Sequence, residues 1–392
     1  MKTVLLLDTG FSSLPIYNYL MREGYHVHVM GNRAGDALAQ MAGPNWIDQD
    51  YSQIDRVQQI MDQKQFDFVV PGCTDLSIEV CQKALSSCTR FDSPHINQHL
   101  ADKEFFRRLC TQLKIPTPQK TPKESFPLGG MFICKPVDAY SGRGISIIDG
   151  LDMAKVHAAD KRAQSASPTN RSLFETFVSG QLYSYSAFLT QKMVEEYFIV
   201  REGSSANPFA VDTSYVEEDF DIAIENEIRT AIEKIAHHLQ LVDGLIHLQF
   251  IVSDGCPYFI EVTRRCPGDL YAKLIEYSTG FDYAGKFASY FVGETYNTLS
   301  TINAPIIRHT MTSNAQVHFE MVQFKHDLKI KAFYPLLGLG EPIAPQQKTR
   351  VGILFSWAMD KNECYQQYMN QDVYAVAHSN GDMATVGSTQ QK

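Results

Sequence analysis

The sequence predicts a protein of mixed α/β and α+β class. An N-terminal open parallel α/β domain precedes a larger domain with antiparallel strands and a β-rich C-terminal extension. The chain has 392 residues, which favours two or three domains. Up to about residue 70, apolar runs alternate with helically spaced segments, as in a βαβ unit. Between residues 173 and 200, strand-like segments instead follow one another directly, which indicates an antiparallel sheet.

The N-terminal domain begins with a continuous apolar run at 4–7, typical of a strand that is buried on both faces of a parallel sheet. Asp8, Thr9 and Gly10 end this run, and apolar residues then recur at helical spacing. The expected elements, in chain order, are a strand at 4–7, a helix at 14–20, a strand at 25–30, a helix at 54–63 and a strand at 66–70.

Loops that follow parallel strands are common places for ligand sites. Thr9, Gly10, Thr74 and Asp75 follow two such strands, and they either face a shared cleft or simply turn the chain. A dinucleotide site is not expected, because Gly10 stands alone and no GxGxxG motif follows the strand.

The middle of the chain alternates between helices and antiparallel strands. Strands with short turns are expected after about residue 305, and the polar residues 379–392 are expected to be a disordered tail. The expected elements before residue 305, in chain order, are a helix at 102–113, strands at 132–136 and 145–148, a helix at 152–164, strands at 173–178, 183–189 and 192–200, a helix at 222–239, and strands at 247–252 and 258–262.

Composition excludes several classes of protein. The net charge is −9 and there is no run of Lys or Arg, so nucleic-acid binding is not expected. No segment approaches the roughly 20 apolar residues that a membrane span needs, and the N-terminus does not look like a signal peptide. The eight cysteines form no CxxC pair, so we expect reduced, mostly buried thiols in a cytoplasmic protein.

Four polar segments stand in a particular order. The first contains Asp102 and Lys103 at a helix start, and the second places Lys135 at the end of an apolar strand. The second continues into a glycine-containing loop at 141–144, and the third is the segment 175–180. The fourth has Gln249 on one strand, Glu261 on the next, and Thr263, Arg264 and Arg265 beyond it.

These four segments together resemble the ATP-grasp superfamily, and within it the members similar to carbamoyl-phosphate synthase and to amino-acid ligases. The resemblance covers about residues 1–305. It implies a preceding α/β domain at 1–95, a two-subdomain ATP-grasp domain at 96–305 and an extension at 306–378 that packs on it. It also implies ATP and Mg²⁺ as cofactors, with Mn²⁺ as an alternative metal.

The resemblance assigns ATP binding to the first two segments. Lys103 and Lys135 would offer compact positive charge to the phosphates. Ser141, Gly142, Arg143 and Gly144 would form the loop over the triphosphate. This loop joins two strands and so is not a P-loop, but its glycines let backbone N–H groups approach a phosphate. The alternative for the loop is a plain hairpin turn.

The third segment matches the adenine-binding hinge of the family. Backbone groups near Glu175 would read the purine edge, and Phe177 and Val178 would form an apolar slot. Leu182 stands where the family often has an acidic residue that contacts ribose, so ribose recognition must be weaker or come from elsewhere.

The fourth segment would hold the metal. Mg²⁺ prefers oxygen ligands, usually one or two carboxylates with substrate phosphates. Gln249 and Glu261 are the expected ligands, and Thr263 takes the place of the usual Asn. That departure leaves open whether one metal or two bind.

Arg265 stands where the family has an arginine on the transferring phosphate, and Arg264 would serve instead or bind the substrate carboxylate. We therefore expect a ligase that phosphorylates a carboxylate and couples the acyl phosphate to an amine. The alternatives are an ATP-grasp enzyme acting on bicarbonate and a non-catalytic nucleotide-binding module. The sequence does not name the acid or the acceptor, and a homodimer is expected only on general grounds.

Overall fold

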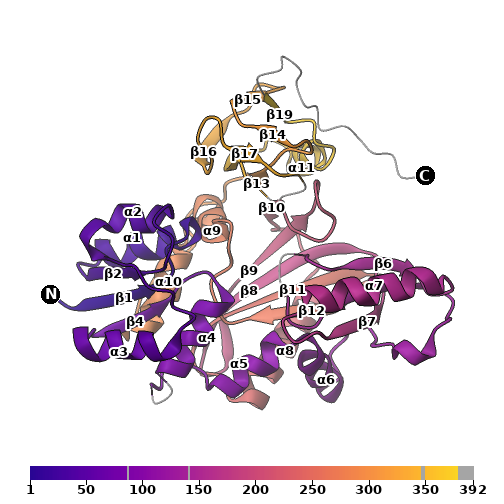
Figure 1. Cartoon of the computed structure of the whole chain (residues 1–392), viewed down its shortest axis with the longest axis horizontal. Coiled ribbons are helices and arrows are strands. Elements are labelled where there is room, and N and C mark those ends of the chain that lie inside the picture. The colour runs from indigo at the N-terminus through magenta and orange to yellow at the C-terminus, as the bar shows by residue number, and fades with distance from the viewer. Residues whose placement is uncertain (86–87, 140–141, 346–348, 378–392) are drawn as a thin grey trace.

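The computed structural model describes residues 1–85, 88–139, 142–345 and 349–377. Three lobes surround a central antiparallel sheet (Figure 1). The N-terminal domain forms one lobe, a small sheet with a covering helix forms the second, and the C-terminal extension forms the third. The expected tail at 379–392 and the loop residue Ser141 lie outside the described residues.

The N-terminal domain is a four-stranded parallel sheet in the order β3-β2-β1-β4. Its central strand β1 is buried on both faces from Val4 to Leu7, which explains the unbroken apolar run in the sequence. The elements are β1 (Thr3–Leu7), α1 (Leu14–Arg22), β2 (His26–Met30), α2 (Ala37–Ala42), β3 (Trp46–Ile47), α3 (Ile54–Lys64), β4 (Phe68–Pro71) and α4 (Asp75–Ala84).

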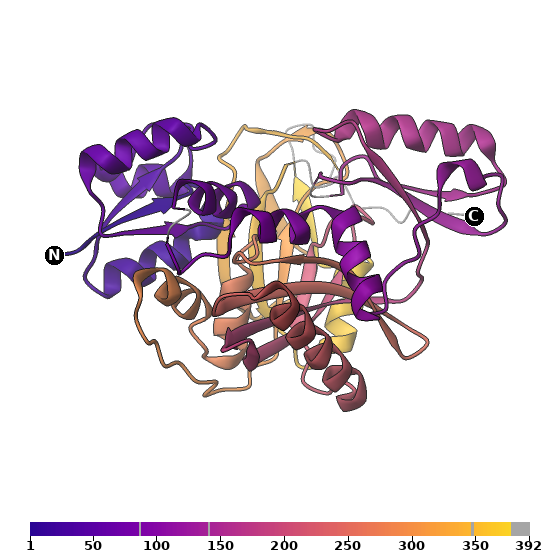
Figure 2. The ribbon, with the colours of Figure 1, turned by 90° about the horizontal axis from the view of Figure 1, so that it is seen from below.

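A segment from much later in the chain completes this domain. Helix α10 (Tyr283–Val292) packs against α1 and β4, and the ring centroids of Phe91 and Phe291 lie 4.9 Å apart. Figure 2 shows α10 beside the N-terminal sheet from below. Residues 283–292 therefore lie with the N-terminal domain in space, although they fall within the predicted 96–305 segment in sequence.

The small lobe contains a three-stranded antiparallel sheet in the order β6-β5-β7, covered by α7 (Met153–Ala166). Phe132, Phe174 and Val156 form its separate core. The strands are β5 (Met131–Pro136), β6 (Ser146–Asp149) and β7 (Ser172–Thr176), and two helices, α5 (Pro94–Ala101) and α6 (Lys103–Leu113), lead into this lobe.

The central sheet has eight strands in the order β12-β11-β8-β9-β10-β13-β18-β16. Its β10–β13 pair joins the middle of the chain to the C-terminal extension, so one sheet continues across the predicted boundary at residue 305. The elements are β8 (Gln181–Thr190), β9 (Met193–Gly203), β10 (Thr213–Val216), α8 (Ile222–Leu239), β11 (Gly244–Ser253), β12 (Cys256–Thr263), α9 (Tyr271–Thr279), β13 (Ile306–Met311), β16 (Ile330–Pro335) and β18 (Gly352–Trp357).

The C-terminal extension contains two further strand pairs and a helix. The strands are β14 (Val317–His318), β15 (Met321–Phe324), β17 (Pro342–Ile343) and β19 (Tyr374–Ala377), and the helix is α11 (Lys361–Met369). The sequence predicts only strands here, which is wrong for α11. This helix buries only Tyr365 and Tyr368, so it shows little apolar periodicity, and its start is marked by Asp360, whose side chain accepts from the Glu363 N–H.

The predicted class is confirmed, and every strand and helix predicted up to residue 262 is present in the predicted order. The sequence analysis did not predict α2, β3, α4, α5 and β10. All eight cysteines are free thiols, as expected. None of the described helices is long and apolar enough to cross a bilayer.

Candidate active site

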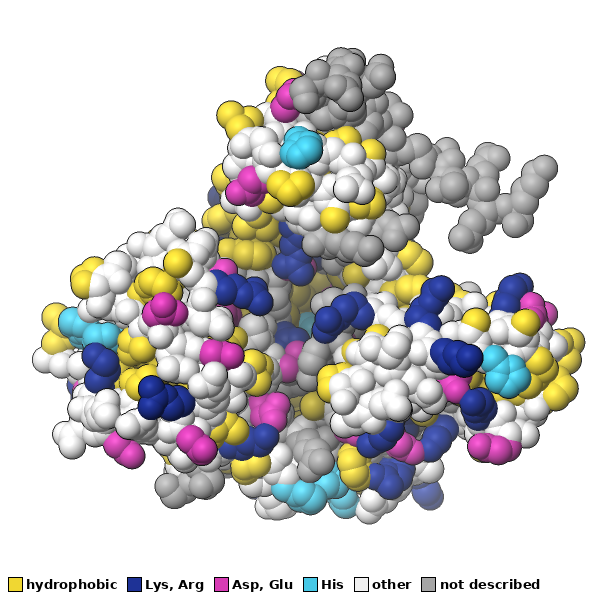
Figure 3. Space-filling view, viewed as in Figure 1, with side chains coloured by type: hydrophobic (Ala, Val, Ile, Leu, Met, Phe, Trp, Pro, Cys, Tyr) yellow, Lys and Arg dark blue, Asp and Glu magenta, His cyan; other side chains and the backbone are white. Residues whose placement is uncertain are grey.

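A hollow opens between the three lobes, and Lys and Arg side chains lie along its margin (Figure 3). Lys135 is buried near the end of β5, and its Nζ lies 2.6 Å from Glu175 Oε2 on β7. Glu175 Oε1 accepts a hydrogen bond from Arg107 Nε of α6 at 2.6 Å. All three side chains are buried, so α6, β5 and β7 meet in one ion cluster.

Two cations share one carboxylate in this cluster, which leaves a net positive charge. Burial lowers the pKa of Lys135 to about 8, against the attraction of Glu175. Burial also works against the charged form of Glu175, but Lys135 and Arg107 outweigh it and hold the pKa of Glu175 below its ordinary value. An anion such as a phosphate would complete the charge balance beside Lys135.

Lys103 approaches the same place from another side. Asp102 caps the start of α6 by accepting from the Glu104 N–H at 2.8 Å, and this cap fixes the position of Lys103 as the first helical residue. The Lys103 Nζ donates to the Ala139 carbonyl at 3.0 Å and lies 3.9 Å from Glu261 Oε2. The predicted phosphate-binding and metal-binding segments therefore meet at this lysine.

The predicted triphosphate loop follows β5. Gly142 and Gly144 have φ of +68° and +75°, in the left-handed region that favours glycine. A Cβ at Gly142 would lie 2.6 Å from the Phe209 carbonyl, so the loop rests closely on the β9–β10 connection. Arg143 is exposed. The role of the loop in covering a triphosphate stays a prediction.

The two predicted metal ligands are direct neighbours. Gln249 on β11 pairs with Glu261 on β12, so both side chains project from the same face of the sheet. The Glu261 side chain is half exposed, and Gln249 is partly buried. Among the described residues, no three His, Cys, Asp or Glu side chains gather to hold a metal by themselves. One carboxylate and one amide oxygen beside a phosphate-binding lysine fit Mg²⁺, which takes few protein ligands when phosphates supply others.

A second carboxylate lies beside this pair and escaped the sequence analysis. Glu202, near the end of β9, is only 4% exposed and accepts from Gln249 Nε2 at 2.6 Å. Burial raises the pKa of Glu202 to about 7. In the sequence it is an acidic residue at the end of a predicted strand, just before a glycine. Many exposed strand ends have the same pattern, so it did not mark Glu202 as a site residue.

Arg265 lies at the same site and makes a two-pronged ion pair with Asp75 at the start of α4. Its Nε and Nη2 donate to the two Asp75 oxygens at 2.8 and 2.9 Å. Burial opposes the charged form, but Asp75 outweighs it and keeps the pKa of Arg265 above its ordinary value. The Thr263 hydroxyl also faces Asp75, at 3.4 Å. Asp75 therefore contacts the residues at the end of β12, whereas a cleft shared with Thr9 and Gly10 stays a prediction.

The structure does not bring Arg264 to this site, which corrects its predicted role. The side chains of Arg264 and Arg265 leave the chain on opposite sides. Arg264 Nε donates to Asp92 at 2.7 Å and its Nη2 donates to the Val242 carbonyl at 2.6 Å. It is buried between the N-terminal domain and β11, where it holds the two together.

The predicted adenine hinge lies at the other end of the cluster. Glu175 is completely buried, and its carboxylate is taken by Lys135 and Arg107. Phe177 is 36% exposed and Val178 is partly buried, just after β7. The Phe177 N–H donates to the Met131 carbonyl at 3.0 Å, so this segment continues beside β5. Its contact with a purine stays a prediction.

Arg308 is another residue that the sequence analysis missed. It lies on β13, is 3% exposed, donates from Nε to Ser214 Oγ at 2.8 Å and from Nη1 to the Asp269 carbonyl at 3.0 Å. Burial lowers its pKa. The sequence signals it only weakly, as one arginine after two isoleucines, because the burial of the whole strand is seen only in the structure.

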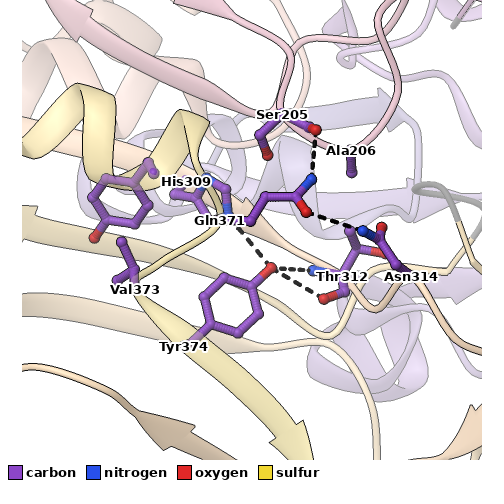
Figure 4. Close-up of a pocket in the computed structure, with 9 residues that line it drawn as sticks. Ser205, Ala206, His309, Thr312, Asn314, Gln371, Val373 and Tyr374 are labelled. Carbon is purple, nitrogen blue, oxygen red and sulfur yellow. Dashed lines mark hydrogen bonds between the residues drawn. The ribbon is translucent and has the colours of Figure 1, made fainter. Parts of the chain in front are cut away.

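A separate small pocket lies between the C-terminal extension and the β9–β10 connection (Figure 4). Its polar side chains are largely bonded to one another. Tyr374 Oη accepts from the Thr312 N–H at 2.8 Å, and Gln371 Nε2 reaches the Ser205 carbonyl. Burial lowers the pKa of His309 to about 4, so this histidine is neutral near pH 7. None of the predicted site residues lines this pocket.

Comparison with known proteins agrees with the geometry. Residues 100–269 match the family model described as an ATP-grasp domain. This segment includes Lys103, Lys135, Gln249, Glu261 and Arg265. No curated protein sequence matches the chain.

Solved structures share the fold over nearly the whole chain. The L-amino acid ligase of Bacillus licheniformis superposes with a TM-score of 0.77 at 17% identity, covering 97% of this chain and 99% of that one. Phosphoribosylglycinamide synthetase of Anaerococcus prevotii gives 0.74 at 16% identity, with 96% and 100% covered. The biotin carboxylase domain of the Hydrogenobacter thermophilus 2-oxoglutarate carboxylase, solved with MgADP, ADP and bicarbonate, gives 0.74 at 14% identity, with 96% and 90% covered. At these identities, the similarity shows a shared fold.

Proposed function

Since the chain belongs to the ATP-grasp superfamily, we propose that it is an ADP-forming ligase that activates a carboxylate with ATP and couples it to an amine. One observation carries this proposal. Lys103 Nζ lies 3.9 Å from Glu261 Oε2, so groups suited to phosphates and to a divalent cation share one site. Arg265 lies next to them, where a transferring phosphoryl group would pass.

Different residues of this chain would contact the phosphates, the metal ion and the transferring phosphoryl group. Lys135 and Lys103 would hold the phosphates of ATP, and Gln249 and Glu261 would hold Mg²⁺. When bound, Mg²⁺ would neutralise charge on the phosphate oxygens. Arg265, held in place by Asp75, would present donors to the oxygens of the transferring group.

The proposed reaction has two steps. A substrate carboxylate oxygen attacks the γ-phosphorus of ATP, the bond to ADP breaks, and an acyl phosphate forms. The amine then attacks the acyl carbon, and the C–O bond to phosphate breaks with its electron pair leaving on phosphate. The nitrogen loses a proton, which phosphate can take up, and an amide forms. Closure of the 142–144 loop would keep water from the acyl phosphate.

A bicarbonate-dependent reaction is the second candidate, because a structure with the same fold was solved with MgADP and bicarbonate. The amino-acid ligase and the phosphoribosylglycinamide synthetase favour the carboxylate–amine reaction. Cytoplasmic location and homodimerisation stay predictions, and light scattering would measure the oligomeric state.

The test is ADP release from ATP and Mg²⁺ against a panel of amino acids, other carboxylates, amines and bicarbonate. We expect release that requires a carboxylate and an amine together. Release with bicarbonate alone would favour the second candidate, and ATP binding without turnover would indicate a binding module. Glu261→Gln is the control: it should abolish turnover and leave the melting temperature unchanged, because this side chain is half exposed. Full activity of that variant would refute the proposed metal site.

A further inference from the structure

Glu202 is a buried carboxylate with an unusual set of partners. It is 4% exposed and makes no direct ion pair with Lys, Arg or His among the described residues, although the charge of Arg308 and a hydrogen bond with Ser184 favour its charged form. Its Oε2 accepts from Gln249 Nε2 at 2.6 Å. A buried charge normally requires a cation or several strong donors, so a carboxylate retained here without a paired cation calls for a specific explanation.

The fold brings Glu202 to Gln249 across an intervening strand. Glu202 is on β9 and Gln249 is on β11, and β8 lies between them. Ser184 of β8 is the register partner of Gln249 and is completely buried. Because serine is small, the longer Glu202 and Gln249 side chains can meet on the face of the sheet that also carries Glu261.

The backbone of Glu202 is fixed from two further elements. Its carbonyl oxygen accepts from Gln181 Nε2 at 2.8 Å and from the Tyr365 hydroxyl of α11 at 3.1 Å. The next residue, Gly203, lies so close to Tyr365 that a Cβ would come within 2.2 Å of the hydroxyl oxygen. Ser184 Oγ in turn lies 3.1 Å from the Tyr271 hydroxyl. The carboxylate therefore has a well-defined position.

This position decides which end of the Gln249 amide faces the metal site. A side-chain amide has an NH₂ end that donates and an oxygen end that accepts, whereas a carboxylate only accepts. With its NH₂ end bonded to Glu202, Gln249 directs its oxygen away from Glu202. Metal ligands are commonly oriented by such partners, and losing the partner typically weakens metal binding.

We propose that Glu202 is a positioning residue that holds the Gln249 amide with its oxygen toward the cation site beside Glu261. This inference rests on the proposed function, because it takes Gln249 and Glu261 as the metal ligands. Glu202 itself does not contact the cation, and it acts through Gln249.

The test measures binding without turnover. Mn²⁺ binding to the protein in the presence of ADP is followed by electron paramagnetic resonance of free Mn²⁺ at pH 8, for the wild type and Glu202→Gln. An amide at position 202 can both donate and accept, so it no longer determines whether the NH₂ or the oxygen of the Gln249 amide faces the cation site. We therefore expect the Kd for Mn²⁺ to rise about 10- to 100-fold. ADP binding without metal should be unchanged. Glu225→Gln is the matched control, because Glu225 is equally buried at 4% exposure but lies on α8.

A double-variant cycle tests the route of the effect. In a Gln249→Ala background, Glu202→Gln should cause little further loss of Mn²⁺ affinity. An equal loss in both backgrounds would overturn the inference, as would wild-type affinity in Glu202→Gln. If the wild type itself did not bind Mn²⁺ with ADP, the proposed function would fall with the inference. Glu202→Asp keeps an accepting carboxylate and should retain part of the affinity, which gives a second variant should Glu202→Gln melt early.

Discussion

Lys135 shows how a single residue is tuned by its surroundings. Its amine is buried, with Glu175 as a partner and Arg107 as a competing cation. Burial lowers its pKa from the ordinary value of 10.5 to about 8, while Glu175 opposes this lowering and Arg107 adds to it. The charged and neutral forms of this lysine therefore interconvert in a range of pH where binding is easily measured.

We predict that ATP binding weakens as the pH rises through 8. In the proposed function the cationic form would hold the phosphates, and the unliganded protein loses this proton above the Lys135 pKa of about 8. The Kd of a non-hydrolysable ATP analogue should rise about tenfold between pH 7 and pH 9, as expected for one proton. Calorimetric titration at several pH values measures it. Lys135→Arg keeps its charge throughout and should give a flatter profile, whereas a flat wild-type profile would contradict the assignment.

At the scale of elements, the ion cluster of Arg107, Glu175 and Lys135 joins α6, β5 and β7. Removing its only carboxylate leaves two buried cations without a counter-ion. We predict that Glu175→Gln lowers the free energy of unfolding by about 3–5 kcal/mol. Glu79→Gln is the control, because Glu79 pairs with Lys83 on an exposed helix face and should change stability by less than about 1 kcal/mol. Chemical denaturation of both variants measures the difference, and equal effects would argue against a structural role for the cluster.

The 142–144 loop allows a similar comparison of two glycines. Gly142 and Gly255 both have positive φ, but a Cβ at Gly142 would collide with Phe209, whereas Gly255 has open space. Alanine at either position costs about 1–2 kcal/mol of backbone strain. Only Gly142→Ala should also displace the loop, so we predict that it alone raises the KM for ATP several-fold. Steady-state kinetics of the two variants test this, and equal KM values would separate the loop from ATP binding.

Some helices and strands could be predicted from the sequence, and others could not. The helix Ile222–Leu239 was predicted with its observed bounds, because its apolar residues follow one face over five turns and Asp221 caps its start. Helix α11 was missed, because it buries only two tyrosines and packs through the extension's own core. The N-terminal domain was predicted without α10, because no local pattern indicates a helix that returns from residue 283.

At the scale of the whole molecule, the site lies where three lobes meet. The proposed metal ligands Gln249 and Glu261 come from the central sheet, Lys135 from the small lobe, and Asp75 from the N-terminal domain. Because one eight-stranded sheet continues into the C-terminal extension, Arg308 of β13 reaches the same region through Asp269. A ligand at this junction would contact residues from parts of the chain that have separate hydrophobic cores.

We therefore predict that ADP with Mg²⁺ stabilises the entire chain against unfolding. A ligand at 100 times its Kd contributes about 2.7 kcal/mol, which should raise the melting temperature by several degrees. Calorimetry or dye-monitored melting measures this shift with ADP alone and with ADP and Mg²⁺. In Glu261→Gln, the part of the shift that depends on Mg²⁺ should disappear. Equal Mg²⁺-dependent shifts in the variant and the wild type would place the metal elsewhere.

The sequence by itself determined the fold class and the order of most elements, and it predicted Lys103, Lys135, Gln249, Glu261 and Arg265 as site residues. These residues stand in local contexts that carry information, such as a lysine inside an apolar strand or a glutamate between apolar neighbours. The ATP-grasp domain match spans all of them.

Only the tertiary structure decided which of two adjacent arginines faces the candidate site. Arg264 pairs with Asp92 and Arg265 pairs with Asp75, and both aspartates come from much earlier in the chain. The tertiary structure also revealed Arg107 and Glu202, whose roles depend on strands and helices that meet only after folding. Side-chain direction and burial set the charge and orientation of these groups, and both arise from long-range packing, which local sequence patterns do not encode.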